Sequence, residues 1–91
     1  MRVLEARFHS RSRGEDEVIV VARVVWYEQP NHPSVQPSPS LLETTAAGAM
    51  LAKLQFLIDS AAPDTFDRLK ALKSQYWSFA DVTPAAGPLS R

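Results

Sequence analysis

The longest helical pattern in the chain runs over residues 41–60. Apolar residues recur there every three or four positions, which is the period of a helix that buries one face. They fall on one arc of roughly 120°, the width of a core-facing stripe: Ala47, Met50, Leu51, Leu54, Leu57 and Ile58. Ser40 and Glu43 precede this stripe with the spacing of a capping box, in which each side chain bonds the other residue's backbone N–H. The pattern predicts a helix that forms the spine of the core.

The opposite side of this helix carries mostly small residues, where a solvated surface would more often carry charges. The residues on this side are Thr45, Gly48, Ala49, Ala52 and Phe56. Three interpretations are open. The side is idle and alanine-rich because alanine is the best helix former, or it packs on another element of the chain, or it contacts a second subunit or a partner.

The first 28 residues predict a β-hairpin. Residues 2–10 alternate, with Leu4, Ala6 and Phe8 pointing to one side. Residues 17–28 are apolar on both faces apart from Arg23, and their β-branched side chains favour a strand. Residues 11–16 are polar and contain Gly14, so we expect a hairpin loop there. Helices on one side leave the other face of the second strand open, which also indicates a further layer or a second subunit.

Residues 29–40 hold four of the seven prolines. Proline lacks a backbone N–H, so we predict an extended connection that does not continue a strand. It is either a crossing loop or a recognition loop that reads a ligand or a partner.

A second helix is predicted after Pro63, because proline suits the first turn and the carboxylates of Asp64 and Asp67 favour its positive end. Its apolar stripe comprises Thr65, Phe66, Leu69, Leu72, Tyr76 and Trp77. Residues 78–83 are either a short third strand or an extended tail. The sequence therefore predicts an α+β fold, in which an antiparallel hairpin, a proline-rich loop and two helices on one face of the sheet form one domain of residues 1–83. Residues 84–91 are predicted to be a flexible tail.

Charge and composition narrow the function. The 91 residues include ten basic and ten acidic ones, and this balance argues against nucleic-acid binding as the main role. Cysteine is absent, which excludes disulfides and thiolate metal sites, and we predict no cofactor and no metal. The N-terminus lacks the apolar run of a signal peptide and no stretch reaches about 18 apolar residues, so we expect a cytoplasmic protein without membrane contact. Seven arginines against three lysines hint at a bacterial or phage genome.

No pattern in the chain assembles catalytic chemistry. Glycine-rich phosphate motifs and nucleophile elbows are absent. His9 falls on the polar side of a strand and His32 in a loop, and neither has a nucleophile and an orienting group nearby in sequence. We therefore predict that the chain is not an enzyme.

Three functions remain. The first is a small protein–protein interaction module, a homodimer that serves as an adaptor, an assembly subunit or an accessory inhibitor encoded by a phage or mobile element. Its candidate interface residues are Thr45, Gly48, Ala49, Ala52, Phe56, Val21, Val25, Tyr27, Tyr76 and Trp77. The alternative is a nucleic-acid-binding protein, whose candidate contacts are Arg7, Arg11, Arg13, Arg23, Arg68, Lys70 and Lys73. The third is a small-molecule or catalytic role around Tyr76, Trp77 and His32.

Overall fold

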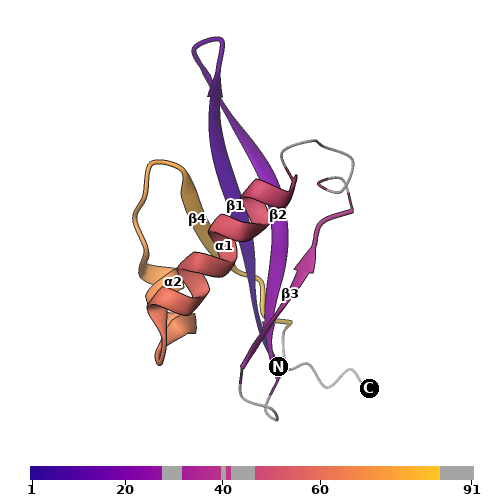
Figure 1. Ribbon diagram of the computed structural model, residues 1–91, viewed down its shortest axis with the longest axis vertical. Coiled ribbons are helices and arrows are strands. Elements are labelled where there is room, and N and C mark those ends of the chain that lie inside the picture. The colour runs from indigo at the N-terminus through magenta and orange to yellow at the C-terminus, as the bar shows by residue number, and fades with distance from the viewer. Residues whose placement is uncertain (28–31, 40, 42–46, 85–91) are drawn as a thin grey trace.

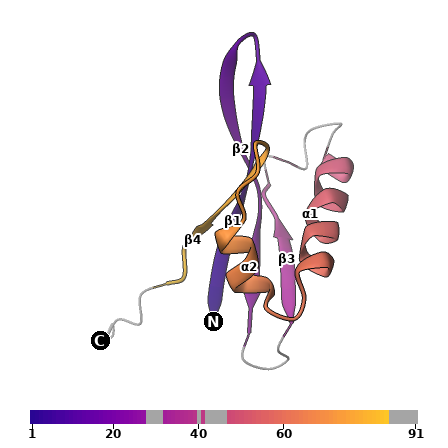
Figure 2. The same cartoon turned by 90° about the vertical axis from the view of Figure 1, so that its left-hand side faces the viewer.

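The chain folds into a four-stranded antiparallel sheet with two helices on one face (Figure 1 and Figure 2). The computed structural model describes residues 1–27, 32–39, 41 and 47–84. The elements are β1 (Arg2–Ser12), β2 (Glu15–Trp26), β3 (Pro33–Pro37), α1 (Ala47–Ala61), α2 (Thr65–Ala71) and β4 (Trp77–Asp81). The sheet order is β3-β2-β1-β4. This architecture confirms the predicted α+β class and the N-terminal hairpin, and β4 is the strand that was one of two alternatives for residues 78–83.

The hairpin between β1 and β2 is tighter than predicted. The expected loop of residues 11–16 is wrong, because Ser12 pairs directly with Glu15 and only Arg13 and Gly14 form the turn. Their φ angles are 55° and 79°. Positive φ at both central residues is the geometry of the two-residue turn that matches the twist of the flanking strands. The polar residues on either side can therefore remain in the ladder.

The core lies between the sheet and the helices. Leu4 and Ala6 of β1 are fully buried, and their partners Val24 and Ala22 on β2 are buried with them. Phe8 packs at the margin of the same core, as the alternation predicted. The stripe of α1 is also confirmed, since Leu54 and Ile58 are buried in this core and Ala47, Met50, Leu51 and Leu57 pack against it. Leu41, Phe66, Leu69, Trp77 and Phe79 complete the core. Burial of such side chains, each worth about 1.5–3 kcal/mol, holds the two layers together.

The proline-rich segment does contain a strand, contrary to the prediction. β3 pairs with β2 in the register Pro33 with Trp26, Val35 with Val24 and Pro37 with Ala22. A proline is tolerated at an edge strand because a missing N–H on the outer side breaks no ladder bond. β3 is an outer strand of the sheet, so its prolines are compatible with pairing.

α2 is shorter than its sequence pattern. α1 is described from Ala47 onward, and the predicted capping box and Thr45 lie outside the described residues. α2 ends at Ala71, because Leu72 is extended with φ −61° and ψ 129°. Trp77 belongs to β4 instead, where it pairs with Phe8 at 5.4 Å between ring centroids. Trp77 and Phe79 are two positions apart, which is the period of a strand. Trp77 therefore belongs to a strand and not to the predicted second helix.

A β-bulge divides the hairpin into two parts. The register shifts between Ala6 and Arg7, which leaves Val21 without a partner on β1. Beyond this point the ladder of β3 with β2 stops at Ala22, and the ladder of β4 with β1 stops at Phe8. We call residues 9–20 the hairpin arm. It projects past the rest of the molecule at the top of Figure 1.

The turn gives a first prediction. Gly14→Val should lower the free energy of unfolding by about 1–2 kcal/mol, because an L side chain at positive φ is strained. Arg13→Asn should leave it unchanged or raise it slightly, since asparagine tolerates this region. Urea denaturation followed by circular dichroism measures both. Equal losses in the two variants would contradict the turn geometry.

The end of β4 gives a second prediction. The hydroxyl and the backbone N–H of Thr83 donate to the Asp81 carboxylate and lower the pKa of that carboxyl, and Lys70 adds a smaller favourable contact. A lowered pKa stabilises the fold above the ordinary value of 3.8 and loses this effect as the pH falls below it. Asp81→Asn should therefore reduce the urea midpoint at about pH 7, and less at about pH 3. A difference that grows on acidification would contradict this assignment.

Candidate functional site

The outer side of α1 is exposed among the described residues. Phe56 has 70% of its surface exposed, the largest exposed fraction among the large apolar residues that the structure describes. Gly48, Ala49 and Ala52 beside it are exposed as well. A Cβ built on Gly48 would meet no atom within 4 Å. No described element of the same chain packs on this side, which leaves an idle surface or a contact with another molecule.

An apolar hollow lies next to Phe56. It has a volume of about 360 Å³ and is lined by Ala52, Lys53, Phe56, Leu57 and Trp77. Trp77 is itself almost buried. A cavity of about 150 Å³ can hold a benzene ring, so this hollow has room for one aromatic side chain. The exposed ring of Phe56 and this hollow therefore lie next to each other on one surface.

The apolar surface continues from this hollow toward α2. A second hollow of about 420 Å³ shares Leu57 with the first. Leu69 and Leu72 line its far side. Leu57 is thus the link between two neighbouring depressions, and the exposed apolar area is larger than Phe56 alone.

Two predicted interface residues of β2 are not available to a partner. The structure buries Val21 completely and leaves Val25 only 4% exposed, so this part of the candidate set is corrected. The bulge directs Val21 into the core, and Val25 pairs with the equally buried Val3.

The aromatic residues Tyr27, Tyr76 and Trp77 of the candidate interface set also differ in exposure. Trp77 is buried against Phe8, while Tyr76 and Tyr27 are each almost half exposed. Tyr76 also stacks on Phe8, with ring centroids 6.0 Å apart. Tyr76 and Tyr27 are therefore the two of these three residues that are available to a partner.

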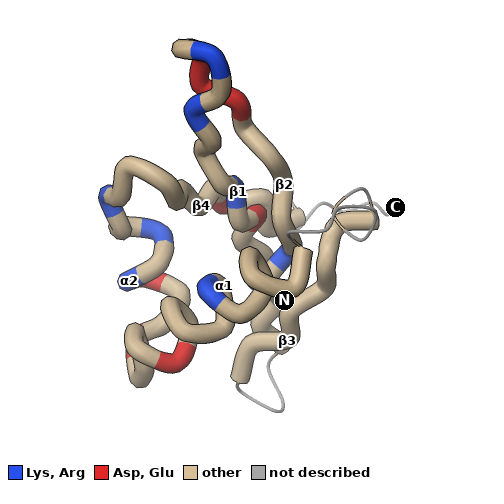
Figure 3. Tube along the Cα trace, turned by 45° about the horizontal axis from the view of Figure 1, so that its top comes forward, with Lys and Arg blue, Asp and Glu red and all other residues tan. Residues whose placement is uncertain are grey.

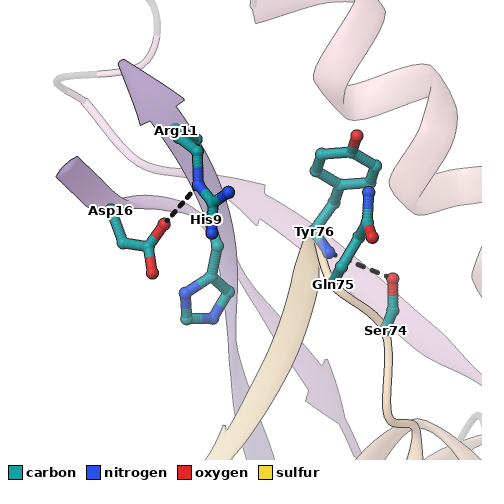
Figure 4. Close-up of a pocket in the computed structure, with 6 residues that line it drawn as sticks. All are labelled: His9, Arg11, Asp16, Ser74, Gln75 and Tyr76. Atoms are coloured by element: carbon teal, nitrogen blue, oxygen red, sulfur yellow. Dashed lines mark hydrogen bonds and ion pairs between the residues drawn. The ribbon is translucent and has the colours of Figure 1, made fainter. Parts of the chain in front are cut away.

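A polar hollow of about 410 Å³ lies where the hairpin arm meets the segment before β4 (Figure 4). His9 and Arg11 come from β1 and Asp16 from β2, and Ser74, Gln75 and Tyr76 face them. Arg11 Nε lies 3.5 Å from Asp16 Oδ1, so the guanidinium and the carboxylate offset each other.

His9 is half-buried here and not simply solvated, because its Nε2 lies 2.6 Å from Ser78 Oγ. No sequence pattern indicates this contact, since Ser78 reaches His9 only through the pairing of β4 with β1. Among the described residues no carboxylate bonds the other ring nitrogen of His9, so the orienting group of a catalytic triad is missing from this pair.

The residues of the third hypothesis lie apart. His32 lines a separate hollow of about 490 Å³ at the opposite end of the sheet, together with Arg2 and Phe66. Trp77 lines the apolar hollow beside α1, and Tyr76 the polar one. The three side chains thus form no common site. Within the described residues no group of three or more histidines, aspartates or glutamates could hold a metal ion.

The basic residues proposed for nucleic-acid binding do not gather into one patch (Figure 3). Strand register places Arg7, Arg11 and Arg23 on the face of the sheet away from the helices. Arg13 lies in the turn of the arm, and Arg68, Lys70 and Lys73 lie in or just after α2.

Three of these cations are offset by acids. Arg7 pairs with Glu5 at 2.7 Å, Arg11 with Asp16, and Lys70 with Asp81 at 3.4 Å. Dispersed and partly neutralised charge does not supply the continuous positive surface that phosphate backbones require.

Among the helices in the described part of the chain, none has the length and hydropathy needed to cross a membrane. Comparisons with protein families, with curated proteins and with solved structures find no match to this chain, so its function has to be argued from its own surface.

Proposed function

We propose that this chain is a non-enzymatic protein–protein interaction module that forms a homodimer through the outer side of α1. The observation that carries the proposal is Phe56, which stands 70% exposed beside an apolar hollow of about 360 Å³. An exposed aromatic residue next to an apolar depression is typical of a binding surface.

A second copy of the chain fits this surface because one patch supplies both the projecting ring and the space for it. Two copies related by a two-fold axis can each place Phe56 in the hollow of the other, with their α1 helices antiparallel. Such an interface is closed and forms a pair, not a filament. The small side chain of Ala52, which lines the hollow, lets the two helix backbones approach closely.

The size of the chain is consistent with this assembly. A domain of 91 residues buries only about 60–65% of its unfolded surface, so its stability margin is small. Burying one phenylalanine in each subunit contributes about 1.5–3 kcal/mol per side chain. Within this class the module would serve as an adaptor, an assembly subunit or an accessory inhibitor.

Light scattering tests the dimer. The wild-type chain should have twice its 10.1 kDa mass, and Phe56→Lys should have the mass of one chain, because a charge cannot enter the apolar hollow. Gln55→Lys is the matched control, since Gln55 is exposed on the same helix but does not line the hollow, and it should remain a dimer. A wild-type monomer at about 100 μM would overturn the proposal, since a useful dimer forms well below this concentration.

Two further variants separate the assembly from the fold. Ala52→Arg should dissociate the dimer and change the unfolding free energy of the monomer by no more than about 0.5 kcal/mol, the usual range for an exposed position. Gly48→Ala should raise helix stability by about 1 kcal/mol, because its Cβ enters open space. Calorimetry measures the unfolding free energy of both variants, and sedimentation measures their mass in solution. An Ala52→Arg variant that stays dimeric would place the interface elsewhere.

A further inference from the structure

The hairpin arm has an open hydrogen-bonding edge along β2. The backbone N–H of His9 donates to the carbonyl of Tyr76 at 2.6 Å, so this residue's peptide groups point toward β4. His9 pairs with Val18. In an antiparallel ladder such a pair exchanges no hydrogen bond, and the peptide groups of Val18 must point away from β1.

The peptide groups two positions before and after Val18 also point away from β1. Asp16 and Val20 share the orientation of Val18, because bonding alternates along a strand. β3 ends its pairing at Ala22, and its last contact is the Ser38 N–H on the carbonyl of Val21. No described residue bonds the outer side of Asp16, Val18 or Val20. Three residues thus offer donors and acceptors in the line that β3 vacates.

This edge lacks some of the devices that protect other edges. β3 begins and ends with proline, which interrupts further pairing on its outer side. The segment of residues 15–20 contains no proline and no lysine. Val18 is 52% exposed and Val20 half-buried, so apolar surface accompanies the open peptide groups.

The charge of the segment selects the partner. Glu15 and Glu17 have no ion pair within the described residues, and only Asp16 is offset, by Arg11. A second copy does not suit this edge. A two-fold axis at Val18 would place Asp16 against Val20 and Glu17 against Ile19, which leaves carboxylates opposite apolar side chains. A strand with basic and apolar residues supplies the missing counter-charges and the apolar contact.

We propose that the outer edge of β2 in the hairpin arm, residues 15–20, binds an extended basic and apolar segment of another protein, which adds to the sheet as a further strand. Main-chain hydrogen bonds to Asp16, Val18 and Val20 give affinity, and the glutamates favour lysine or arginine in the partner. This surface is distinct from the outer side of α1 and does not depend on dimerisation.

The test uses a fluorescein-labelled, end-capped heptapeptide of alternating lysine and valine, with fluorescence anisotropy as the readout. The wild-type chain should bind it, and binding should weaken as salt rises. A glutamate–valine peptide of the same length should not bind. Amide shifts in nuclear magnetic resonance should move at Asp16, Val18 and Val20.

Val18→Pro is the decisive variant, because it removes an N–H that the fold does not use. It should weaken peptide binding about tenfold, the effect of losing one hydrogen bond and leaving its partner carbonyl unpaired. Val18→Thr keeps the N–H and should bind like the wild type. A peptide methylated at alternate backbone nitrogens should not bind the wild-type chain, and this control holds even if Val18→Pro does not fold.

Three results would overturn the proposal. The first is no binding of the lysine–valine peptide at about millimolar concentration, because a specific complex of this kind has a lower dissociation constant. The others are unchanged binding of the methylated peptide and amide shifts confined to α1. The dimer is measured separately by the mass of Phe56→Lys, so failure of one proposal is distinguishable from failure of the other.

Discussion

The pairing of β1 with β2 is the constraint on which the rest of the structure depends. Its register sets Leu4 and Ala6 on the same side as Val24 and Ala22, and this side alone receives the helices. A slip of one residue would turn the whole apolar set to the opposite face. The two-residue turn at Arg13 and Gly14 fixes the register from one end. The bulge at Val21 then shifts the pairing within the arm relative to the body of the sheet.

The same ladder determines which surfaces remain open. α1 packs on the core with one stripe, centred on Leu54 and Ile58, and no other described element packs on its outer side. β3 and β4 are too short to accompany the whole hairpin, so the arm continues as a two-stranded ribbon. Two-stranded ribbons are marginal on their own, and an added strand would stabilise the arm as well as the complex. Both open surfaces are consequences of short elements packed on a long hairpin.

Sequence patterns predicted the features that depend on local periodicity. The alternation of Leu4, Ala6 and Phe8 and the stripe around Leu54 were enough for the hairpin, the main helix and the α+β class. Features that depend on pairing partners were not predictable. Pro33 and Pro37 argue against a strand until β3 is known to lie at an edge.

The end of α2 was missed because the apolar residues after Leu69 fit two periods at once. Trp77 continues a helical stripe in the sequence, and it also alternates with Phe79 as a strand does. Only the contact with Phe8 decides between them. The bond from His9 to Ser78 and the open peptide groups of Val18 follow from register, which one strand's sequence does not contain. Among the site residues, Phe56 was correctly predicted to lie off the core face of the helix. Val21 and Val25 were predicted to contact a partner, but they are buried within the chain itself.

The two proposed surfaces differ in the force that each uses. The outer side of α1 offers apolar area and shape, which favour a copy with the same patch. The edge of β2 offers peptide groups and uncompensated carboxylates, which favour a basic partner and exclude a copy. They lie on different parts of the molecule, one on the helix layer and one in the plane of the sheet (Figure 2). A dimer through α1 would therefore carry two strand-binding edges, and a partner with two basic segments would bind it more tightly than either segment alone, provided that its linker spans both arms.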